Sequence, residues 1–222
     1  MSASHPSPLA SRRFDTLLYD FGGVFTGSPF AAIADNAAAL GLTAAELKHL
    51  VFGPYHADTD HPWHQLERGE LTFGDARTAI MDHARAAGHD FDPFTALRSS
   101  TEDGRDHASV MVEHLRELRS EGYRTAIVTN NIREFREHWV KMIPVDELFD
   151  DIVDSAFEGI RKPDPRIYHL ALERVSGVAS RTVFLDDFAP NVEAARALGM
   201  AGVVVTEDRH AAVAELDALL GR

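Results

Sequence analysis

Three carboxylates in this 222-residue chain stand where they could share a metal ion. Asp20 directly follows a short apolar segment, residues 14–19, and Asp186 and Asp187 follow another, residues 182–185. If both segments are parallel strands of one sheet, the three side chains meet at its carboxyl edge, where open α/β sheets bind their ligands. Close carboxylates repel one another unless they are protonated or share a cation. Because Mg²⁺ prefers a few hard oxygen ligands and also takes phosphate oxygens, we predict Mg²⁺ as the cofactor.

Donors for an anion occur at two further places. Thr129 and Asn130 come after the apolar residues 123–128, and Lys162 precedes a predicted helix. A hydroxyl, an amide and an ammonium can hold phosphate oxygens, while a carboxylate such as Asp20 can act as a nucleophile. The set therefore predicts phosphoryl transfer through an aspartyl-phosphate, assisted by a divalent ion. Taken one at a time, each of these residues also fits an ordinary role in a turn or a helix cap.

The pattern of apolar residues predicts the elements that position these side chains. Buried parallel strands are short continuous apolar runs bounded by turn residues. Such runs occupy residues 14–19, 123–128, 182–185 and 201–205, with a weaker one at 151–155. Apolar residues at three- and four-residue spacing predict helices at residues 105–120, 132–140, 166–175, 191–198 and 210–220. Alternating strands and helices predict an α/β fold with a doubly wound, Rossmann-like parallel sheet.

A long insertion separates the first predicted strand from the second. Most of residues 29–100 show helical patterns, and none of them forms a convincing buried strand. A small α-helical cap on the α/β core is the simplest explanation. We therefore predict a flexible N-terminal tail at residues 1–13 and an α/β core made of residues 14–27 and 105–222. The helical cap is predicted to occupy the insertion at residues 28–104.

Four segments together resemble the motifs of the haloacid dehalogenase (HAD) superfamily, in the family's order. They are YDFGGVFTGSPF, IVTNN, EGIRKPDPRIYHLAL and FLDDFAPNVEAARALGM. The resemblance extends from residue 14 to about residue 220. It is greatest to the phosphatase-like, subfamily IA domains at the N-terminus of soluble epoxide hydrolases and of certain acyl-CoA dehydrogenase family proteins. It implies a hydrolase with a helical cap over its active site.

The resemblance also implies which residues bind the metal and which bind the phosphoryl group. Asp20 matches the family's nucleophile, which is also a metal ligand, and Asp186 and Asp187 match its acidic fourth motif. By the position of the motif, Asp187 is the direct ligand and Asp186 acts through water. The backbone carbonyl of Gly22 matches a further ligand.

Three residues match the motifs that handle the phosphoryl group. Thr129 and Asn130 match the motif that holds this group during transfer. Lys162 matches the lysine that neutralises the charge of nucleophile and phosphate, so Thr129 and Lys162 join Asp20 as implied catalytic residues. The implied partner is a small phosphorylated substrate, of which a lipid-like or acyl phosphate is one example.

Gly22 is the main departure from the family pattern, because the family places a second aspartate at this position as general acid and base. Loss of such a group costs about 10²–10⁴-fold in rate. Three alternatives follow: a slow or specialised phosphatase, a non-catalytic phosphate-binding domain, and a metal-independent 2-haloacid dehalogenase. The dehalogenase branch lacks an acidic fourth motif, so the Asp186-Asp187 pair argues against it.

A second group of polar residues lies in the predicted cap, between His56 and His64. Its density of His and Asp resembles a metal site, but its spacing matches no ligand template. We expect a loop in which Phe52, Tyr55 and Trp63 partly face the active site. One of its histidines (His56, His61 or His64) could partly replace the missing acid.

Composition narrows the classes of function. The 22 Lys and Arg against 35 Asp and Glu give a net charge of −13, which disfavours binding to nucleic acid or to anionic membranes. The absence of Cys excludes disulfide scaffolds, thiol nucleophiles and Cys-ligated metal centres. No stretch reaches the length of a membrane span, and the N-terminus does not resemble a signal peptide. We expect a cytoplasmic monomer or homodimer.

Overall fold

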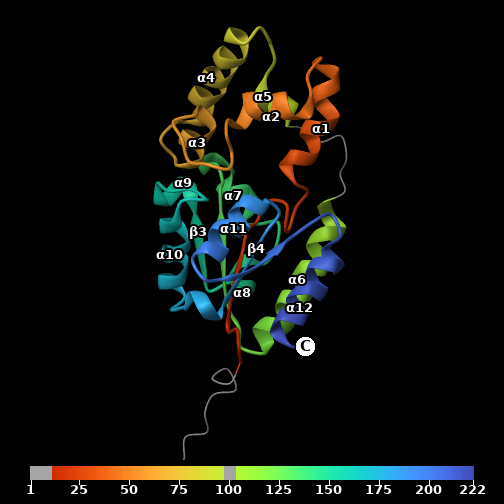
Figure 1. Cartoon of the computed structure of the whole chain (residues 1–222), viewed down its shortest axis with the longest axis vertical. Helices are drawn as coiled ribbons and strands as arrows, with labels where there is room; N and C mark the ends of the chain where they lie inside the picture. The colour runs from red at the N-terminus through yellow and green to blue at the C-terminus, as the bar shows by residue number, and fades with distance from the viewer. Residues whose placement is uncertain (1–11, 98–103) are drawn as a thin grey trace, which may run out of the picture.

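A five-stranded parallel sheet forms the centre of the molecule (Figure 1). The computed structural model describes residues 12–97 and 104–222. The strands, in chain order, are β1 (Thr16–Tyr19), β2 (Arg124–Thr129), β3 (Asp151–Asp154), β4 (Thr182–Asp186) and β5 (Ala201–Val204). Their order across the sheet is β3-β2-β1-β4-β5, so β1 lies between β2 and β4. Every pairing is parallel, which confirms the predicted α/β class and brings the carboxyl ends of the strands to one edge.

Burial on both faces of the sheet explains why the strands are continuous apolar runs in the sequence. Every residue of β1 and of β4 is completely buried. Strands covered on both sides need apolar side chains in both directions, so they lack polar alternation. The observed bounds differ from the predicted ones by at most two residues.

Helices cover both faces of the sheet. Four long helices do so, namely α6 (Gly104–Ser120), α10 (Pro165–Arg174), α11 (Ala189–Ala197) and α12 (Arg209–Leu220). Successive strand residues point to opposite faces, so Leu17 packs with α6 and α12, whereas Leu18 packs with α10 and α11. Figure 1 shows α6 and α12 side by side on their face. Three short elements complete the core, namely α8 (Val145–Leu148), α9 (Ser155–Glu158) and η3 (Ala179–Arg181).

The single helix predicted over residues 132–140 is not what the structure shows. A 3₁₀ turn, η2 (Arg133–Phe135), is followed by one α-helical turn, α7 (Arg136–Trp139). The two buried residues of the segment face different places. Ile132 packs into the cap, while Trp139 packs on Phe21 of the core with ring centres 4.5 Å apart. One helix would not satisfy both contacts, so the segment is broken.

The first five helices after β1 form the inserted cap, beyond the carboxyl edge of the sheet (Figure 1). They are α1 (Pro29–Ala39), α2 (Ala44–Phe52), α3 (Pro62–Glu67), α4 (Phe73–Ala86) and α5 (Pro93–Ala96). Side chains that accept backbone N–H groups begin them, and α2 has a full capping box between Thr43 and Glu46. Their apolar faces share a hydrophobic cluster of their own, which includes Leu47, Leu66 and Ile80. The inserted helical cap is thus confirmed, while its exact limits at 28 and 104 stay a prediction.

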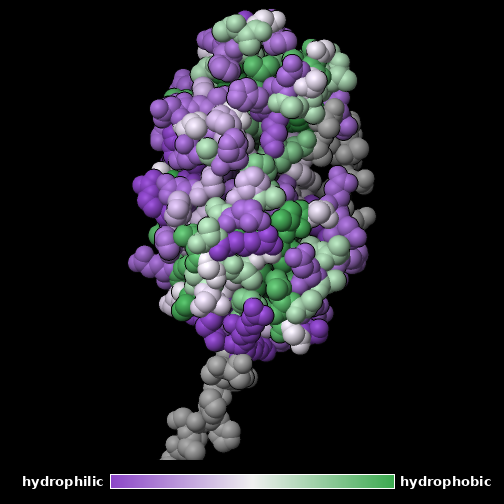
Figure 2. Space-filling model, in the orientation of Figure 1, coloured by the Kyte–Doolittle hydropathy of each residue, from purple (hydrophilic) through white to green (hydrophobic). Residues whose placement is uncertain are grey.

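The predicted tail is only partly covered by the structure. Residues 1–11 lie outside the described residues, but Arg12 is packed on the core. Its guanidinium forms an ion pair with Glu121 at 3.3 Å and lies 4.5 Å from the centre of the Tyr123 ring. In Figure 2 hydrophilic side chains cover much of the visible face, with smaller hydrophobic patches between them. No helix within the described ranges has the length and apolar character needed to cross a bilayer.

Candidate active site

A buried ammonium joins the carboxylates at the carboxyl edge of the sheet. Lys162 is completely buried in the loop before α10. Its Nζ lies 2.9 Å from Oδ1 of Asp20, which follows β1, and 2.6 Å from Oδ2 of Asp186, which ends β4. Burial lowers the pKa of Lys162, but the two carboxylates more than offset this, so its pKa is raised and the side chain is an ammonium. The residues predicted at this edge do come together.

Asp186 and Asp187 differ in how many hydrogen-bond donors their carboxylates already accept from. Oδ2 of Asp186 accepts from Lys162 and, at 3.1 Å, from Asn191, while its Oδ1 accepts from the backbone N–H of Phe188 at 2.8 Å. Oδ2 of Asp187 accepts from the hydroxyl of Ser28, and no donor among the described residues occupies its other oxygen. Asp187 therefore has the more available carboxylate of the two.

The acidic group fits a divalent cation. One oxygen from each of Asp20, Asp186 and Asp187 lies within 4.8 Å of the others, and the described residues contain no second group of this kind. Burial and the charge of Asp20 together raise the pKa of Asp186 to about 7 and that of Asp187 to about 6. Three carboxylates against the one ammonium of Lys162 leave two negative charges without a partner in the group. A divalent ion would supply that missing charge.

The loop after β1 passes close to Asp187. Gly23 has a φ of +70°, and a Cβ on it would lie 2.1 Å from Cγ of Asp187. Only glycine fits there, because a side chain would collide with the carboxylate and strain the backbone. At Gly22, by contrast, a Cβ would meet no atom within 4 Å. Lack of space for a side chain therefore does not explain why this chain has glycine and not aspartate at position 22.

Thr129 and Asn130 stand at the end of β2 but differ in what they offer a ligand. The amide of Asn130 accepts from the backbone N–H of Lys162 at 2.7 Å and donates to its carbonyl at 3.0 Å. Its side chain thus holds Lys162 in place, and its predicted contact with a phosphoryl group stays a prediction. Thr129 ends β2, and its hydroxyl makes no hydrogen bond to residues 12–97 or 104–222. That hydroxyl is free to receive a ligand.

Three residues support the site without having been predicted. Ser28 donates to Asp187, as described above. Arg209, at the start of α12, donates to the carbonyl of Val24 at 3.2 Å and to that of Thr26 at 2.9 Å, so it fastens the loop that follows β1. Arg161 precedes Lys162 and is completely buried. For Ser28 the helix-cap pattern was a usable signal, but the partners of both arginines are distant in sequence.

Arg161 connects the active-site loop of the core to the cap. Its Nε donates to Oε2 of Glu67 at 2.7 Å, and both side chains are buried. The other oxygen of Glu67 accepts from the hydroxyl of Tyr55 and from the indole N–H of Trp63, both at 2.8 Å. The guanidinium also lies 4.7 Å from the centre of the Tyr55 ring and donates to the carbonyl of Ala57 at 2.9 Å. Cap and core therefore share one buried hydrogen-bonded ion pair.

The His- and Asp-rich segment of the cap has structural roles. Nδ1 of His61 accepts from the backbone N–H of Trp63 and so caps α3, while Nδ1 of His64 accepts from that of Thr59. Burial lowers the pKa of His61 to about 4 and that of His64 to about 3, so both are neutral near pH 7. Trp63, which we expected to face the active site, is instead 7% exposed and lies within the cap cluster.

Four aromatic rings lie where cap and core meet. Phe30, Phe52 and Tyr55 come from the cap, and Phe188 follows Asp187 in the core. The Phe188 ring centre lies 5.3 Å from that of Phe30 and 5.2 Å from that of Tyr55. The expectation that Tyr55 lies near the site agrees with its contact with Phe188, whereas Phe52 is 1% exposed and packs with Trp63 in the cap cluster. An apolar surface thus stands beside the carboxylates.

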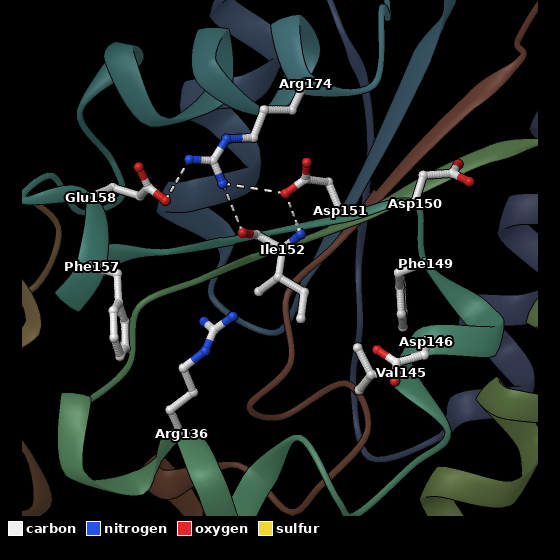
Figure 3. A pocket seen from close by; sticks show the side chains of 10 residues that line it. All are labelled: Arg136, Val145, Asp146, Phe149, Asp150, Asp151, Ile152, Phe157, Glu158 and Arg174. Atoms are coloured by element: carbon white, nitrogen blue, oxygen red, sulfur yellow. Dashed lines mark hydrogen bonds and ion pairs between the residues drawn. The ribbon is translucent and has the colours of Figure 1, made fainter.

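A separate hollow of about 450 Å³ opens at the edge strand β3 (Figure 3). Arg174 crosses it, with ion pairs to Asp151 at 3.3 Å and to Glu158 at 2.6 Å and a hydrogen bond to the carbonyl of Ile152. Its lining includes none of the predicted site residues. We therefore place the chemistry at the Lys162 site and not in this hollow.

Comparison with known proteins shows the family to which the chain belongs. The model of one protein family, haloacid dehalogenase-like hydrolase, matches residues 14–199. The chain belongs to this family. It is 31% identical over 219 residues to acyl-CoA dehydrogenase family member 10 of Mus musculus, covering 95% of the chain but only 19% of that protein. It is 32% identical over 216 residues to a sesquiterpene phosphatase of Aspergillus oryzae, covering 94% of the chain and 97% of that protein.

The solved structures agree in fold. A HAD family enzyme of Bacteroides thetaiotaomicron, in complex with magnesium and inorganic phosphate, superposes with a TM-score of 0.54 at 19% identity. The match covers 88% of this chain and 96% of that one. Together these similarities confirm a HAD-like hydrolase and support a phosphatase-like function. This chain spans about a fifth of the length of the mouse relative, so it corresponds to one part of that protein.

Proposed function

We propose that the protein is a Mg²⁺-dependent phosphatase that hydrolyses a small phosphate monoester through an aspartyl-phosphate on Asp20. The observation that carries this proposal is the ammonium of Lys162 between Asp20 and Asp186, with Asp187 beside them. Asp20, Asp187 and the Gly22 carbonyl would hold the ion, with Asp186 acting through water. When bound, Mg²⁺ supplies positive charge for the oxygens of the transferring group.

The chain's own residues account for both halves of the reaction. Asp20 attacks phosphorus in line with the bond to the alcohol, and water later cleaves the acyl phosphate. Lys162 neutralises charge on nucleophile and phosphate, and its buried position makes that interaction stronger than in water. The unpaired hydroxyl of Thr129 binds a phosphoryl oxygen. Asn130 holds Lys162 through its side chain and completes the phosphoryl-binding turn.

The rings at the mouth of the site favour an alcohol with an apolar group. Phe30, Tyr55 and Phe188 place aromatic surface beside Asp187. An apolar group that replaces water on such surface gains free energy in proportion to the area it covers. One of the most similar relatives is named for a sesquiterpene substrate, which is apolar. We infer a monoester of an apolar, lipid-like alcohol.

Hydrolysis of p-nitrophenyl phosphate tests the proposal, because its leaving group needs little protonation. We expect turnover that requires Mg²⁺, stops with EDTA and is absent in Asp20→Asn. Mg²⁺-dependent phosphate binding without turnover would indicate the binding-domain alternative instead. Metal-independent halide release from a 2-haloacid would indicate a dehalogenase. Either result would overturn the phosphatase assignment.

The substitution Gly22→Asp should increase activity on alkyl phosphates. The space for a side chain at this position is open, and an added carboxylate could serve as acid and base. We expect kcat for an alkyl phosphate to rise by about 10²-fold, the lower end of the range of general acid catalysis, and kcat for p-nitrophenyl phosphate to change much less. Gly22→Asn, which has the same size without the acid, is the matched control. An equal gain in both variants would contradict the explanation.

A further inference from the structure

Lys48 is a half-buried ammonium in the cap that faces aromatic rings. It lies in α2, and its Nζ is 4.0 Å from the centre of the Phe30 ring and 4.6 Å from that of Phe188. Among the described residues no carboxylate lies within ion-pair distance of it, and none donates or accepts a hydrogen bond with it. Ring faces attract a cation but do not neutralise it. An ammonium in this position is therefore suited to an anion that the free protein does not contain.

The surroundings of Lys48 place it above the phosphoryl site. Phe188 directly follows Asp187, and Phe30 lies in the first turn of α1, the helix that Ser28 caps. The hydroxyl of Ser28 also donates to Asp187. Burial lowers the pKa of Lys48, and the negative charge of Asp187 acts on it in the opposite direction. Lys48 thus faces the carboxylates from the cap side.

In-line displacement decides which substrate atom turns toward the cap. Asp20 attacks from the carboxyl edge of the sheet, so the leaving oxygen must lie on the opposite side of phosphorus. The cap covers that side. The family's usual acid is absent at Gly22, and both His61 and His64 are neutral and engaged in cap contacts. The leaving oxygen therefore has no proton donor at Gly22, His61 or His64.

We propose that Lys48 is a catalytic residue that protonates the leaving oxygen, in place of the acid that the chain lacks at position 22. The inference rests on the phosphatase function proposed above. Partial burial destabilises the charged form of the Lys48 amine, which makes its proton easier to give. It also keeps water away from the departing group.

The proton balance closes over one turnover. The bond from phosphorus to the alcohol oxygen breaks as the bond from Asp20 to phosphorus forms, and the electron pair stays on the leaving oxygen. Lys48 gives that oxygen a proton, so an alcohol departs and an amine remains. Water then attacks phosphorus, releases phosphate, restores the Asp20 carboxylate and returns a proton to Lys48.

A comparison of two esters in the Lys48→Met variant tests this role. Methionine keeps the length and helix propensity of the side chain but has no proton to give. We expect kcat for hexyl phosphate to fall by about 10²-fold, and that for p-nitrophenyl phosphate by no more than about threefold, because a nitrophenolate leaves without an acid. Lys48→Gln should show the same split, and Lys141→Met, at an exposed lysine, should change neither ester.

The outcomes separate this inference from the function on which it rests. Equal losses on both esters would indicate a structural or binding role for Lys48 and would overturn the inference alone. Unchanged rates on both would overturn it as well. Wild-type protein that hydrolyses neither ester in Mg²⁺ would overturn the phosphatase assignment and the inference together.

Discussion

Glu67→Ala should lower the free energy of unfolding at pH 7 by about 3–5 kcal/mol, the usual cost of removing one partner from a buried ion pair. The substitution removes the hydrogen-bonded carboxylate of the completely buried Arg161 guanidinium and leaves it only the longer ion pair with Asp58, at 3.8 Å. It also removes the acceptor for Tyr55 and Trp63. For a chain of this size the midpoint of thermal unfolding should fall by about 6–20 °C. Thermal or urea denaturation followed by circular dichroism measures the change.

A matched control is available in the same cap. Glu70 forms an ion pair with Arg68 but is exposed, so Glu70→Ala should cost no more than about 1 kcal/mol. The double variant Glu67→Met with Arg161→Met removes both charges, and it should recover the part of the lost stability that comes from the unpaired guanidinium, while Tyr55 and Trp63 still lack their acceptor. A loss in Glu67→Ala no larger than in Glu70→Ala would contradict a buried pair in solution.

Lys162→Met should remove at least about 10²–10³-fold of kcat on p-nitrophenyl phosphate, as expected when a preorganised charge is lost from a buried site. The same change leaves the carboxylates of Asp20 and Asp186 without their shared ammonium. The variant should therefore also be less stable than wild type at pH 7.5. Lys141→Met, which changes an exposed lysine, serves as the control.

The stability of Lys162→Met should depend on pH in a definite direction. The pKa of Asp186 is raised to about 7 even with the lysine present, and the lysine lowers it, so the variant's carboxylates hold protons more tightly still. Between about pH 4 and 7 the folded variant then binds more protons than the unfolded chain, and its stability rises as pH falls. Unfolding at pH 5 and 7.5 should show a smaller deficit at pH 5. A deficit that is equal or larger at pH 5 would contradict this account.

The sheet and its carboxyl edge were predictable because their causes are local. A strand buried on both faces must be apolar throughout, and parallel strands must end at the same edge. Asp20, Thr129 and Asp186 follow from these two rules alone. The resemblance to a family then identified Lys162, which sits in a loop that no periodicity predicts.

The contacts between cap and core were not predictable, because their partners are far apart in the chain. Arg161 and Glu67 are 94 residues apart, and Lys48 meets Phe188 only after the cap has folded over the core. Local helix and strand propensities do not predict contacts between residues so far apart in the chain. The same reason explains the break at residues 132–140, since the segment must reach both hydrophobic clusters.

The buried pair between Arg161 and Glu67 also restricts how substrate preference can be exchanged between relatives. The cap has its own hydrophobic cluster, so in principle a different cap could be grafted onto this core to change the alcohol that is accepted. Any graft must bring a carboxylate to the position of Glu67, or else leave a guanidinium buried without a counter-charge next to Lys162. The cap of this protein can therefore be replaced only by a cap that carries a carboxylate opposite Arg161.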